Sequence, residues 1–215
     1  GYSLYGTAIS GNVDLPNVTK LGNEAFAVCP NVETINLPNV LSMGDWVFKQ
    51  CAKLKSVSMA SVTQSGNYLF DGTTTLESFY APKLQGTGNQ SFKNSVNLTT
   101  VDISGATSIG DWAFQGCENL SNLKVGSNIK VVNAGAFSGC KSITSLVLPS
   151  TVEYIGEWAF EKTGLTELFI SWDQDGLDVL STFPESFGQD EGRPDLVVKV
   201  PADLKDVYGD EWEDF

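Results

Sequence analysis

Histidine is missing from this chain of 215 residues, and methionine occurs only twice. Because histidine is the commonest general base and metal ligand near neutral pH, its absence removes the usual routes to acid–base catalysis and metal binding. No acidic residue is arranged with a serine or cysteine and a base, and no glycine-rich phosphate loop occurs. We therefore expect a protein that is not an enzyme, with no catalytic residues, no cofactor and no metal.

Long apolar runs and basic residues are also scarce. No run of 18 apolar residues occurs, so we expect no membrane-spanning helix and no membrane insertion. Thirteen Lys and Arg residues stand against 26 Asp and Glu residues, which gives a net charge of −13. Such a surface repels phosphate groups, so nucleic acid is not an expected partner.

The sequence does contain a long repeat. Phenylalanine recurs at intervals of 22 or 23 residues, at Phe26, Phe48, Phe70, Phe92, Phe114, Phe137 and Phe160. Four residues before it stands a glycine in six of the seven units, with Asn133 in the remaining one. Apolar residues keep their places eight before, six after and nine after it in nearly every unit. Such a period indicates a solenoid, in which stacked copies share one core.

Each repeat contains two short elements. After the phenylalanine, apolar and polar residues alternate, as in Val32 to Pro38, and this alternation predicts a short half-buried strand. Before it, an Asp or Asn such as Asp45 follows the glycine and is a suitable N-cap for a short helical turn that points Phe48 inward. The expected fold class is a right-handed repeat solenoid with short parallel strands and short helical turns.

The repeat resembles the BspA-like class of leucine-rich repeats found on bacterial cell surfaces. The segments LGNEAFAVCPNVETINLP, IGDWAFQGCENL and IGEWAF carry the resemblance, which covers roughly residues 12 to 170. The third and fourth repeats depart from it, with Ser65 and Thr87 in place of Ile, and Thr73 and Ser95 in place of Cys. The resemblance implies a solenoid of the α/β leucine-rich repeat type and a secreted or surface-anchored bacterial protein. Some members of the class are adhesins that bind host proteins, whereas others have no known ligand.

We expect one solenoid domain over residues 1–215. It divides into an incomplete first unit at 2–21, repeats at 22–170, and an irregular insertion with a C-terminal cap at 171–215. The segment LVVKVPADLKDVYGDEWEDF resembles the strand–Pro–helix–aromatic segment that ends many such arrays. It predicts a strand around Leu196 to Val200, then a helix with Leu204, Val207 and Tyr208 on one face, which would cover the apolar end of the stack.

The four cysteines occupy one column of the repeat, three residues after the phenylalanine: Cys29, Cys51, Cys117 and Cys140. Because Thr73, Ser95 and Thr163 fill this column elsewhere, it takes a small side chain and favours buried structural thiols. Zinc ligands usually come in close pairs, whereas these are at least 22 residues apart. In adjacent units the Cβ atoms would lie ~5 Å apart instead of the ~3.8 Å that a disulfide prefers. We expect reduced thiols, with a disulfide, metal binding or a nucleophile as the alternatives.

An acidic segment, WDQDGLD, places Asp173, Asp175 and Asp178 around a glycine. A calcium loop of the EF-hand type needs more oxygen ligands and a glutamate at its twelfth position, where this chain has Pro184. A solvated loop is the favoured interpretation, and a calcium site is the alternative.

Two surfaces are candidates for ligand contact. The outward side of the predicted strands is small and hydroxyl-rich, and its candidate contact residues are Tyr80, Asp102, Lys124, Val147 and Phe169. The second candidate surface is an aromatic row two residues before the repeat phenylalanine, made up of Trp46, Tyr68, Trp112 and Trp158. These rings either cover the joints between units or form a stacking platform for sugar or protein.

Two functional classes remain open from the sequence. The first is an extracellular or cell-surface binding or adhesion module, a monomer that recognises a host or cell-surface protein or glycan through a solenoid face. The second is a structural spacer or scaffold that presents another domain and has no ligand of its own. Because gaps at Gln90 and Gly135 interrupt the aromatic row, we favour the strand side around Tyr80, Asp102 and Lys124 as the contact surface.

Overall fold

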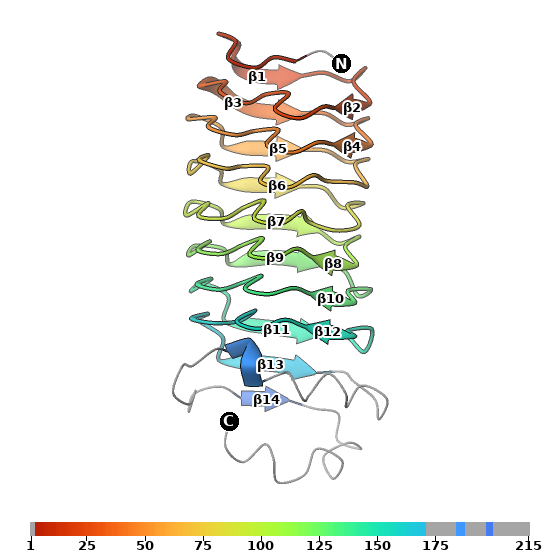
Figure 1. The fold of residues 1–215 in the computed structure, drawn as a ribbon, viewed down its shortest axis with the longest axis vertical. Helices are drawn as coiled ribbons and strands as arrows, with labels where there is room; N and C mark the ends of the chain where they lie inside the picture. The colour runs from red at the N-terminus through yellow and green to blue at the C-terminus, as the bar shows by residue number, and fades with distance from the viewer. Residues whose placement is uncertain (1–2, 171–183, 188–196, 200–215) are drawn as a thin grey trace.

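The structure is a computed structural model that describes residues 3–170, 184–187 and 197–199. The chain winds into a solenoid of about seven stacked turns, and the short parallel strands of successive turns lie on the same side of the stack (Figure 1). Adjacent turns are in register, because a 22-residue period places equivalent residues side by side. Thus Val57 pairs with Phe79, and Phe79 pairs with Val101.

The strands form two main sheets and two short ladders. The six-stranded sheet contains β1 (Ser10–Asp14), β3 (Asn31–Asn36), β5 (Ser56–Ser58), β6 (Ser78–Tyr80), β7 (Thr100–Ile103) and β9 (Asn122–Val125). The three-stranded sheet contains β11 (Ser145–Leu148), β13 (Glu167–Ile170) and β14 (Val197–Lys199). The short ladders contain β2 (Lys20–Leu21) and β4 (Ser42–Met43), and β8 (Ser108–Ile109), β10 (Val131–Val132) and β12 (Tyr154–Ile155).

The expected short helical turns are wrong. The segments around the repeat phenylalanines are successive tight turns, and no α-helix occurs in the described residues, where the one helical element is the 3₁₀ turn η2 (Pro184–Phe187). Trp46 (φ 54°) and Gln50 (φ 53°) adopt left-handed backbone conformations that interrupt a helix. The physical reason is competition from the next turn of the solenoid, since the N–H groups of Trp46 and Phe48 donate to Asn67 and Leu69 one turn away (3.0 and 2.8 Å).

The Asp and Asn residues expected to cap the helical turns also form hydrogen bonds with the next turn of the solenoid. Oδ1 of Asn23 accepts a hydrogen bond from the backbone N–H of Asp45 in the next turn (3.0 Å), and Oδ1 of Asp45 accepts one from Asn67 (2.7 Å). The series continues from Asn67 to Asn89 (2.8 Å) and from Asn89 to Asp111 (3.0 Å). These four side chains therefore join successive turns to one another instead of closing a helix within each turn.

One hydrophobic core runs through the stack. Its centre is the column of repeat phenylalanines, which are all buried and lie 4.8–6.0 Å apart between ring centroids in consecutive turns. The inward residues of the strands, such as Ile35, Val57 and Val101, cover this column from the strand side. No single turn could bury these side chains alone, so the core depends on stacking.

The C-terminal part of the chain is described in pieces. The strand expected around Leu196 to Val200 is confirmed as β14, which pairs in parallel with β13. Phe187 in η2 extends the phenylalanine column, 5.6 Å from Phe160. The acidic segment with Asp173, Asp175 and Asp178, and the helix expected after Pro201, lie outside the described residues.

Candidate functional site

The strand side carries three of the predicted contact residues in one row. Tyr80, Asp102 and Lys124 occupy equivalent positions of β6, β7 and β9, so the parallel register places them next to one another. The Tyr80 side chain is 45% exposed, and Lys124 Nζ lies 3.9 Å from a carboxylate oxygen of Asp102. Asp102 also accepts a hydrogen bond from the Ser104 hydroxyl (2.8 Å). The row combines an aromatic ring, an ion pair and a hydroxyl on a fixed backbone.

The other two predicted contact residues form a separate pair. Val147 and Phe169 are partners in the β11–β13 ladder, in a different sheet from Tyr80. Val147 is exposed, and Lys199 Nζ lies 4.7 Å from the centre of the Phe169 ring, within the range of a cation–π contact. The structure therefore divides the five residues into a polar group of three and a more apolar group of two.

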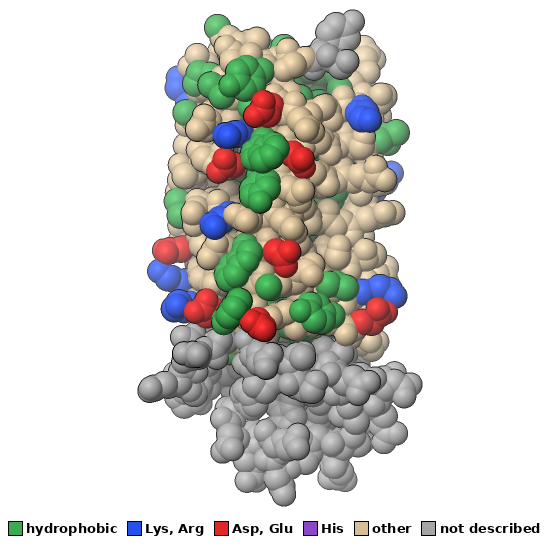
Figure 2. All heavy atoms as spheres, in the orientation of Figure 1, with side chains coloured by type: hydrophobic (Ala, Val, Ile, Leu, Met, Phe, Trp, Pro, Cys, Tyr) green, Lys and Arg blue, Asp and Glu red, His purple; other side chains and the backbone are tan. Residues whose placement is uncertain are grey.

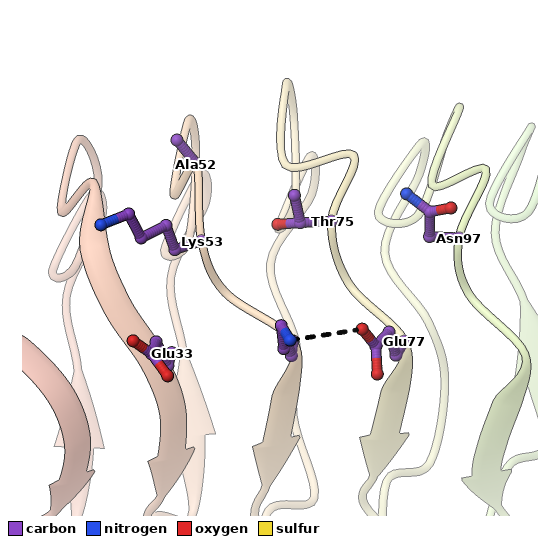
Figure 3. Close-up of a pocket in the computed structure, with 7 residues that line it drawn as sticks. Glu33, Ala52, Lys53, Thr75, Glu77 and Asn97 are labelled. Atoms are coloured by element: carbon purple, nitrogen blue, oxygen red, sulfur yellow. Dashed lines mark ion pairs between the residues drawn. The ribbon is translucent and has the colours of Figure 1, made fainter.

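A shallow charged groove lies beside the first group and was not singled out from the sequence. It has a volume of about 420 Å³ and is lined by Glu33, Ala52, Lys53, Lys55, Thr75, Glu77 and Asn97 (Figure 3). Charge alternates along one column of the repeat, and Lys55 Nζ lies 4.0 Å from Glu77. Reading the repeat column by column for charge would have revealed this alternation.

A second cavity lies at the N-terminal end of the stack. It has a volume of about 660 Å³ and a mainly apolar lining that includes Leu4, Ile9, Leu15, Val18 and Phe26. Within the stack, the equivalent side chains are covered by the preceding turn. The cavity is therefore the uncovered end of the shared core, and the polar residues in its lining are Asn17, Thr19 and Lys20.

The aromatic row forms two stacked pairs. Trp46 and Tyr68 stack with their ring centroids 5.3 Å apart and their planes 7° apart. Trp112 and Trp158 stack at 6.0 Å and 22°, although they belong to units separated by the unit of Gly135. A Cβ atom added at Gly135 would overlap the indole ring of Trp112, so the glycine makes room for this second pair.

The two stacked pairs are separate from each other and do not form one continuous row of rings. All four aromatic residues have left-handed backbones (φ 53–57°), a conformation that costs about 1 kcal/mol for a residue other than glycine. On the face shown in Figure 2, hydrophobic side chains form an interrupted column with acidic and basic side chains on either side. The rings stack on each other along the array in two separate pairs, and all four residues are at least partly exposed.

The cysteine column is a hydrogen-bonding position as well as a packing position. All four thiols are free and buried, which confirms the reduced state expected from the repeat spacing. The thiols donate to backbone carbonyl oxygens of the preceding turn: Cys29 to Leu4 (3.0 Å), Cys51 to Phe26 (3.1 Å), Cys117 to Phe92 (3.0 Å) and Cys140 to Phe114 (3.1 Å). The column therefore selects a small side chain that can donate.

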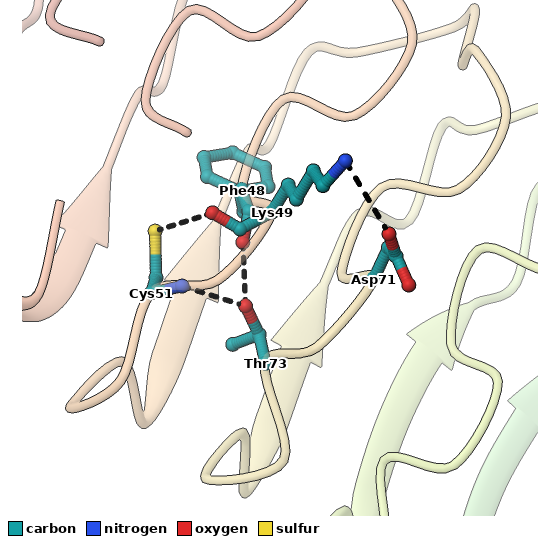
Figure 4. A network of polar contacts seen from close by, with 5 residues as sticks. All are labelled: Phe48, Lys49, Cys51, Asp71 and Thr73. Atoms are coloured by element: carbon teal, nitrogen blue, oxygen red, sulfur yellow. Dashed lines mark hydrogen bonds and ion pairs between the residues drawn. The ribbon is translucent and has the colours of Figure 1, made fainter. Parts of the chain in front are cut away.

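Threonine satisfies the same requirement in the third repeat. The Thr73 hydroxyl donates to the Phe48 carbonyl oxygen (2.6 Å) and accepts from the Cys51 N–H (2.9 Å), as Figure 4 shows. Burial raises the pKa of Cys51 and of Cys140 to about 12, and it raises the pKa of Cys117 well above its ordinary value. Protonated, buried thiols of this kind are poor nucleophiles and poor metal ligands.

The described part of the chain shows no other centre for chemistry. Over residues 3–170, 184–187 and 197–199, no group of three or more Cys, Asp or Glu side chains is placed to hold a metal ion. Among those same residues, none forms a helix with the length and apolar character needed to cross a membrane.

Comparison with known proteins identifies the repeat. The family model described as "BspA type Leucine rich repeat region" matches in six copies over residues 2–117 and 66–177. No curated protein matches the chain in sequence. A leucine-rich repeat protein of T. pallidum has a similar solved structure, with a TM-score of 0.63 and 22% identity, covering 83% of this chain and 84% of that one.

A second solved structure, of a leucine-rich repeat protein from Bacteroides ovatus ATCC 8483, has a TM-score of 0.58 and 23% identity. It covers 89% of this chain, which spans 62% of that protein. At these identities the two structures support the fold alone. The family model covers most of the sequence, including the repeats that the structure stacks. The chain belongs to the BspA-type leucine-rich repeat family.

Proposed function

We propose that this chain is a non-enzymatic recognition module of a secreted or cell-surface bacterial protein. In this proposal it acts as a monomer and binds a host or cell-surface protein or glycan through the strand side of the solenoid. Membership of the BspA-type family supports a surface-protein repeat module. The proposed binding needs only contact at the surface and no reactive side chain. The cysteine thiols fit this proposal, because they are buried and stay protonated as hydrogen-bond donors.

The observation that carries the proposal is the row of Tyr80, Asp102 and Lys124. Exposed tyrosine rings are frequent anchors in protein and sugar recognition, because they bury a large area and lose little side-chain entropy. Here the ring stands beside an ion pair on consecutive parallel strands. Since the phenylalanine core fixes these strands, a ligand would meet a surface that is already ordered, which reduces the entropy cost of binding.

The second candidate function is a stiff spacer that presents another domain and binds nothing itself. The stacked pairs Trp46–Tyr68 and Trp112–Trp158 favour it, because they connect turns along the array: the first pair joins neighbouring turns, and the second spans the turn of Gly135. A spacer would tolerate substitution of any exposed strand residue without loss of function.

A binding screen separates the two functions. The full chain is titrated against a glycan array and a panel of extracellular-matrix proteins, and any captured ligand is then tested with variants. Tyr80→Ala should weaken binding at least about fivefold, or ~1 kcal/mol, with the melting temperature nearly unchanged. Tyr154→Ala is the matched control, because Tyr154 is equally exposed but belongs to β12 in another ladder.

Three outcomes would contradict the proposal. Capture of no ligand in the whole screen favours the spacer. Equal loss of binding in Tyr80→Ala and Tyr154→Ala shows contact without a defined site. Loss of binding in Trp112→Ala, with Tyr80→Ala unaffected and stability retained, moves the contact surface to the aromatic row.

A further inference from the structure

The strand side of the solenoid has a break between β9 and β11. These strands belong to consecutive repeats, yet β9 ends one sheet and β11 begins another, with no pairing between them. Nearly all Cα–Cα distances between the two strands exceed 8 Å, whereas hydrogen-bonded neighbours lie about 4.8 Å apart. Figure 1 shows β9 and β11 set farther apart than the strands above and below them.

The break is confined to the strand side. On the adjoining side, β10 pairs with both β8 and β12, and in the core Phe114 and Phe137 stack at 5.5 Å. The two repeats are therefore stacked normally except along their strands. The break coincides with the first repeat of 23 residues, between Phe114 and Phe137, after four intervals of 22.

Specific backbone groups face this gap without partners. In intact pairs, the N–H of Met59 donates to the Tyr80 carbonyl oxygen (2.8 Å), and the N–H of Ala81 donates to that of Asp102 (2.9 Å). The equivalent bond, from Val125 to Val147, is missing. By the same alternation, the N–H and C=O groups of Leu123 and Val125 on β9, and of Ser145 and Val147 on β11, point into the gap.

The apolar side chains at the gap are incompletely covered. Leu123, Val125 and Leu146 are only partly buried, although the residues in the same columns of β5, β6 and β7 are buried. The gap thus has two facing edges with free backbone groups and a half-covered apolar floor. A strand that pairs with both edges requires them to stand at twice the ordinary spacing, about 9–10 Å.

We propose that the gap binds one extended peptide segment of a partner protein by strand addition, hydrogen-bonded on one side to β9 and on the other to β11. This inference goes beyond the proposed function, because the hydrogen bonds that it invokes come from backbone groups of the gap; of the Tyr80 row it uses only the Lys124 side chain. Edges that lack a partner recruit extended peptides through main-chain bonds, and alternate side chains supply the specificity.

The gap also specifies the chemistry of the peptide. Side chains directed inward would lie between Leu123 and Leu146, so these positions call for apolar, β-branched residues. The outward position lies between Lys124 and Val147, and the exposed ammonium group of Lys124 favours an acidic residue there. The chain's own β7 segment, TTVDISG (residues 99–105), has this pattern and already places its Asp beside Lys124 on the other side.

The first test is amide hydrogen exchange of the full chain, resolved by residue. Without peptide, the amides of Leu123, Val125, Ser145 and Val147 should exchange rapidly, whereas the intervening amides of Lys124 and Leu146 are protected by β7 and β13. Equal protection of all six amides in the free chain would show that the gap is closed in solution and would overturn the proposal.

The second test uses a labelled synthetic peptide, TTVDISG, and fluorescence anisotropy. The peptide should bind at micromolar to millimolar concentration and should slow exchange at the four gap amides. The same peptide with N-methyl groups on its Val and Asp residues loses a donor toward each side and should not bind. Failure of TTVDISG to bind at millimolar concentration, or equal binding of the methylated peptide, would overturn the proposal.

A protein variant completes the design. Val125→Pro with Val147→Pro removes two N–H donors that point into the gap and are unpaired in the free chain, so the fold should be retained. Peptide affinity should fall about tenfold or more. Tyr80→Ala should leave peptide binding unchanged, which separates this inference from the proposed function. Unchanged peptide affinity in a folded double-proline variant would refute strand addition.

Discussion

The Sγ atom of Cys51 donates a hydrogen bond to the backbone carbonyl oxygen of Phe26, 3.1 Å away in the preceding turn. The two residues are 25 positions apart, and the same relationship recurs wherever cysteine occupies this column. It explains why cysteine and threonine both occur there. The buried carbonyl oxygen needs a donor, and the space around it admits only a small side chain.

The first prediction follows from this bond. Cys51→Ala should destabilise the protein by about 1–3 kcal/mol, because the Phe26 carbonyl oxygen is left buried without a donor. Cys51→Thr should cost much less, since Thr73 fills the same position in the next repeat and donates in the same way. Urea denaturation of the two variants measures the difference. Equal destabilisation by alanine and threonine would show that the column selects for volume alone.

The second prediction concerns a serine in the same column. The Ser95 hydroxyl oxygen is buried and lacks a hydrogen-bond partner. Because the cysteine thiols in this column donate to a carbonyl oxygen of the preceding turn, Ser95→Cys should stabilise the protein by about 1 kcal/mol. The Ser56→Cys variant, at a half-buried position of β5, does not add this bond and serves as the control. An unchanged or lower urea midpoint for Ser95→Cys would contradict the assigned geometry.

The third prediction is a loss of stability at alkaline pH. Burial raises the pKa of Cys51 from 9.0 to about 12 in the folded chain, and that of Cys140 likewise. The unfolded thiols ionise above pH 9 while the folded ones keep their protons, so the stabilising contribution is complete below pH 9 and declines as the pH rises toward 12. The free energy of unfolding should fall by up to about 1.4 kcal/mol per pH unit for each thiol.

A matched variant isolates the contribution of the thiols. With Cys51 and Cys140 both replaced by threonine, the alkaline slope of stability should be clearly shallower than in the original chain. Denaturation by urea at several pH values between 8 and 11 provides the comparison. Parallel slopes for the two proteins would assign the alkaline loss to other groups.

The fourth prediction concerns the place of Gly135 beneath Trp112. Gly135→Ala should destabilise the chain by about 2 kcal/mol more than Gly139→Ala. Both glycines have positive φ, but only at Gly135 does the added Cβ overlap the indole ring of Trp112, whereas its nearest neighbour at Gly139 is 3.6 Å away. The near-ultraviolet circular dichroism of the Trp112–Trp158 pair should change only in Gly135→Ala.

A double variant checks the cause of this loss. If the overlap with Trp112 is responsible, Trp112→Ala should remove most of the additional penalty when combined with Gly135→Ala. If the double variant loses as much stability as the two single variants together, the cause is the backbone conformation of Gly135. The stacked pair would then not contribute to the penalty.

The fifth prediction concerns the side chains that join successive turns. Asp45→Ala should cost about 1 kcal/mol or more, because the N–H of Asn67 loses its acceptor. Asp45→Asn keeps an oxygen at the same position, as Asn23 and Asn89 do in their turns, and should be nearly neutral. If the asparagine variant is as unstable as the alanine variant, the charge of Asp45 is what matters and not the acceptor.

The sequence by itself determined the period, the core and the family. Once a strand of each unit pairs with the strand of the next, residues 22 or 23 positions apart lie side by side. The column of phenylalanines from Phe26 to Phe160 therefore predicted a continuous core. The free thiols and the strand β14 also followed from spacing and alternation. These features depend on periodicity, which a single chain displays directly.

Only the tertiary structure decided how the turns are built and where the sheet is interrupted. Local rules assign Asp45 to a helix within its own turn, but its oxygen and the N–H groups around it bond to the next turn, 22 residues away. The stacking of Trp112 on Trp158 across Gly135 is likewise invisible to a pattern that compares nearest repeats. The gap between β9 and β11 arises between two units that both carry the strand pattern. In each case a contact between turns, and not a preference within one turn, sets the conformation.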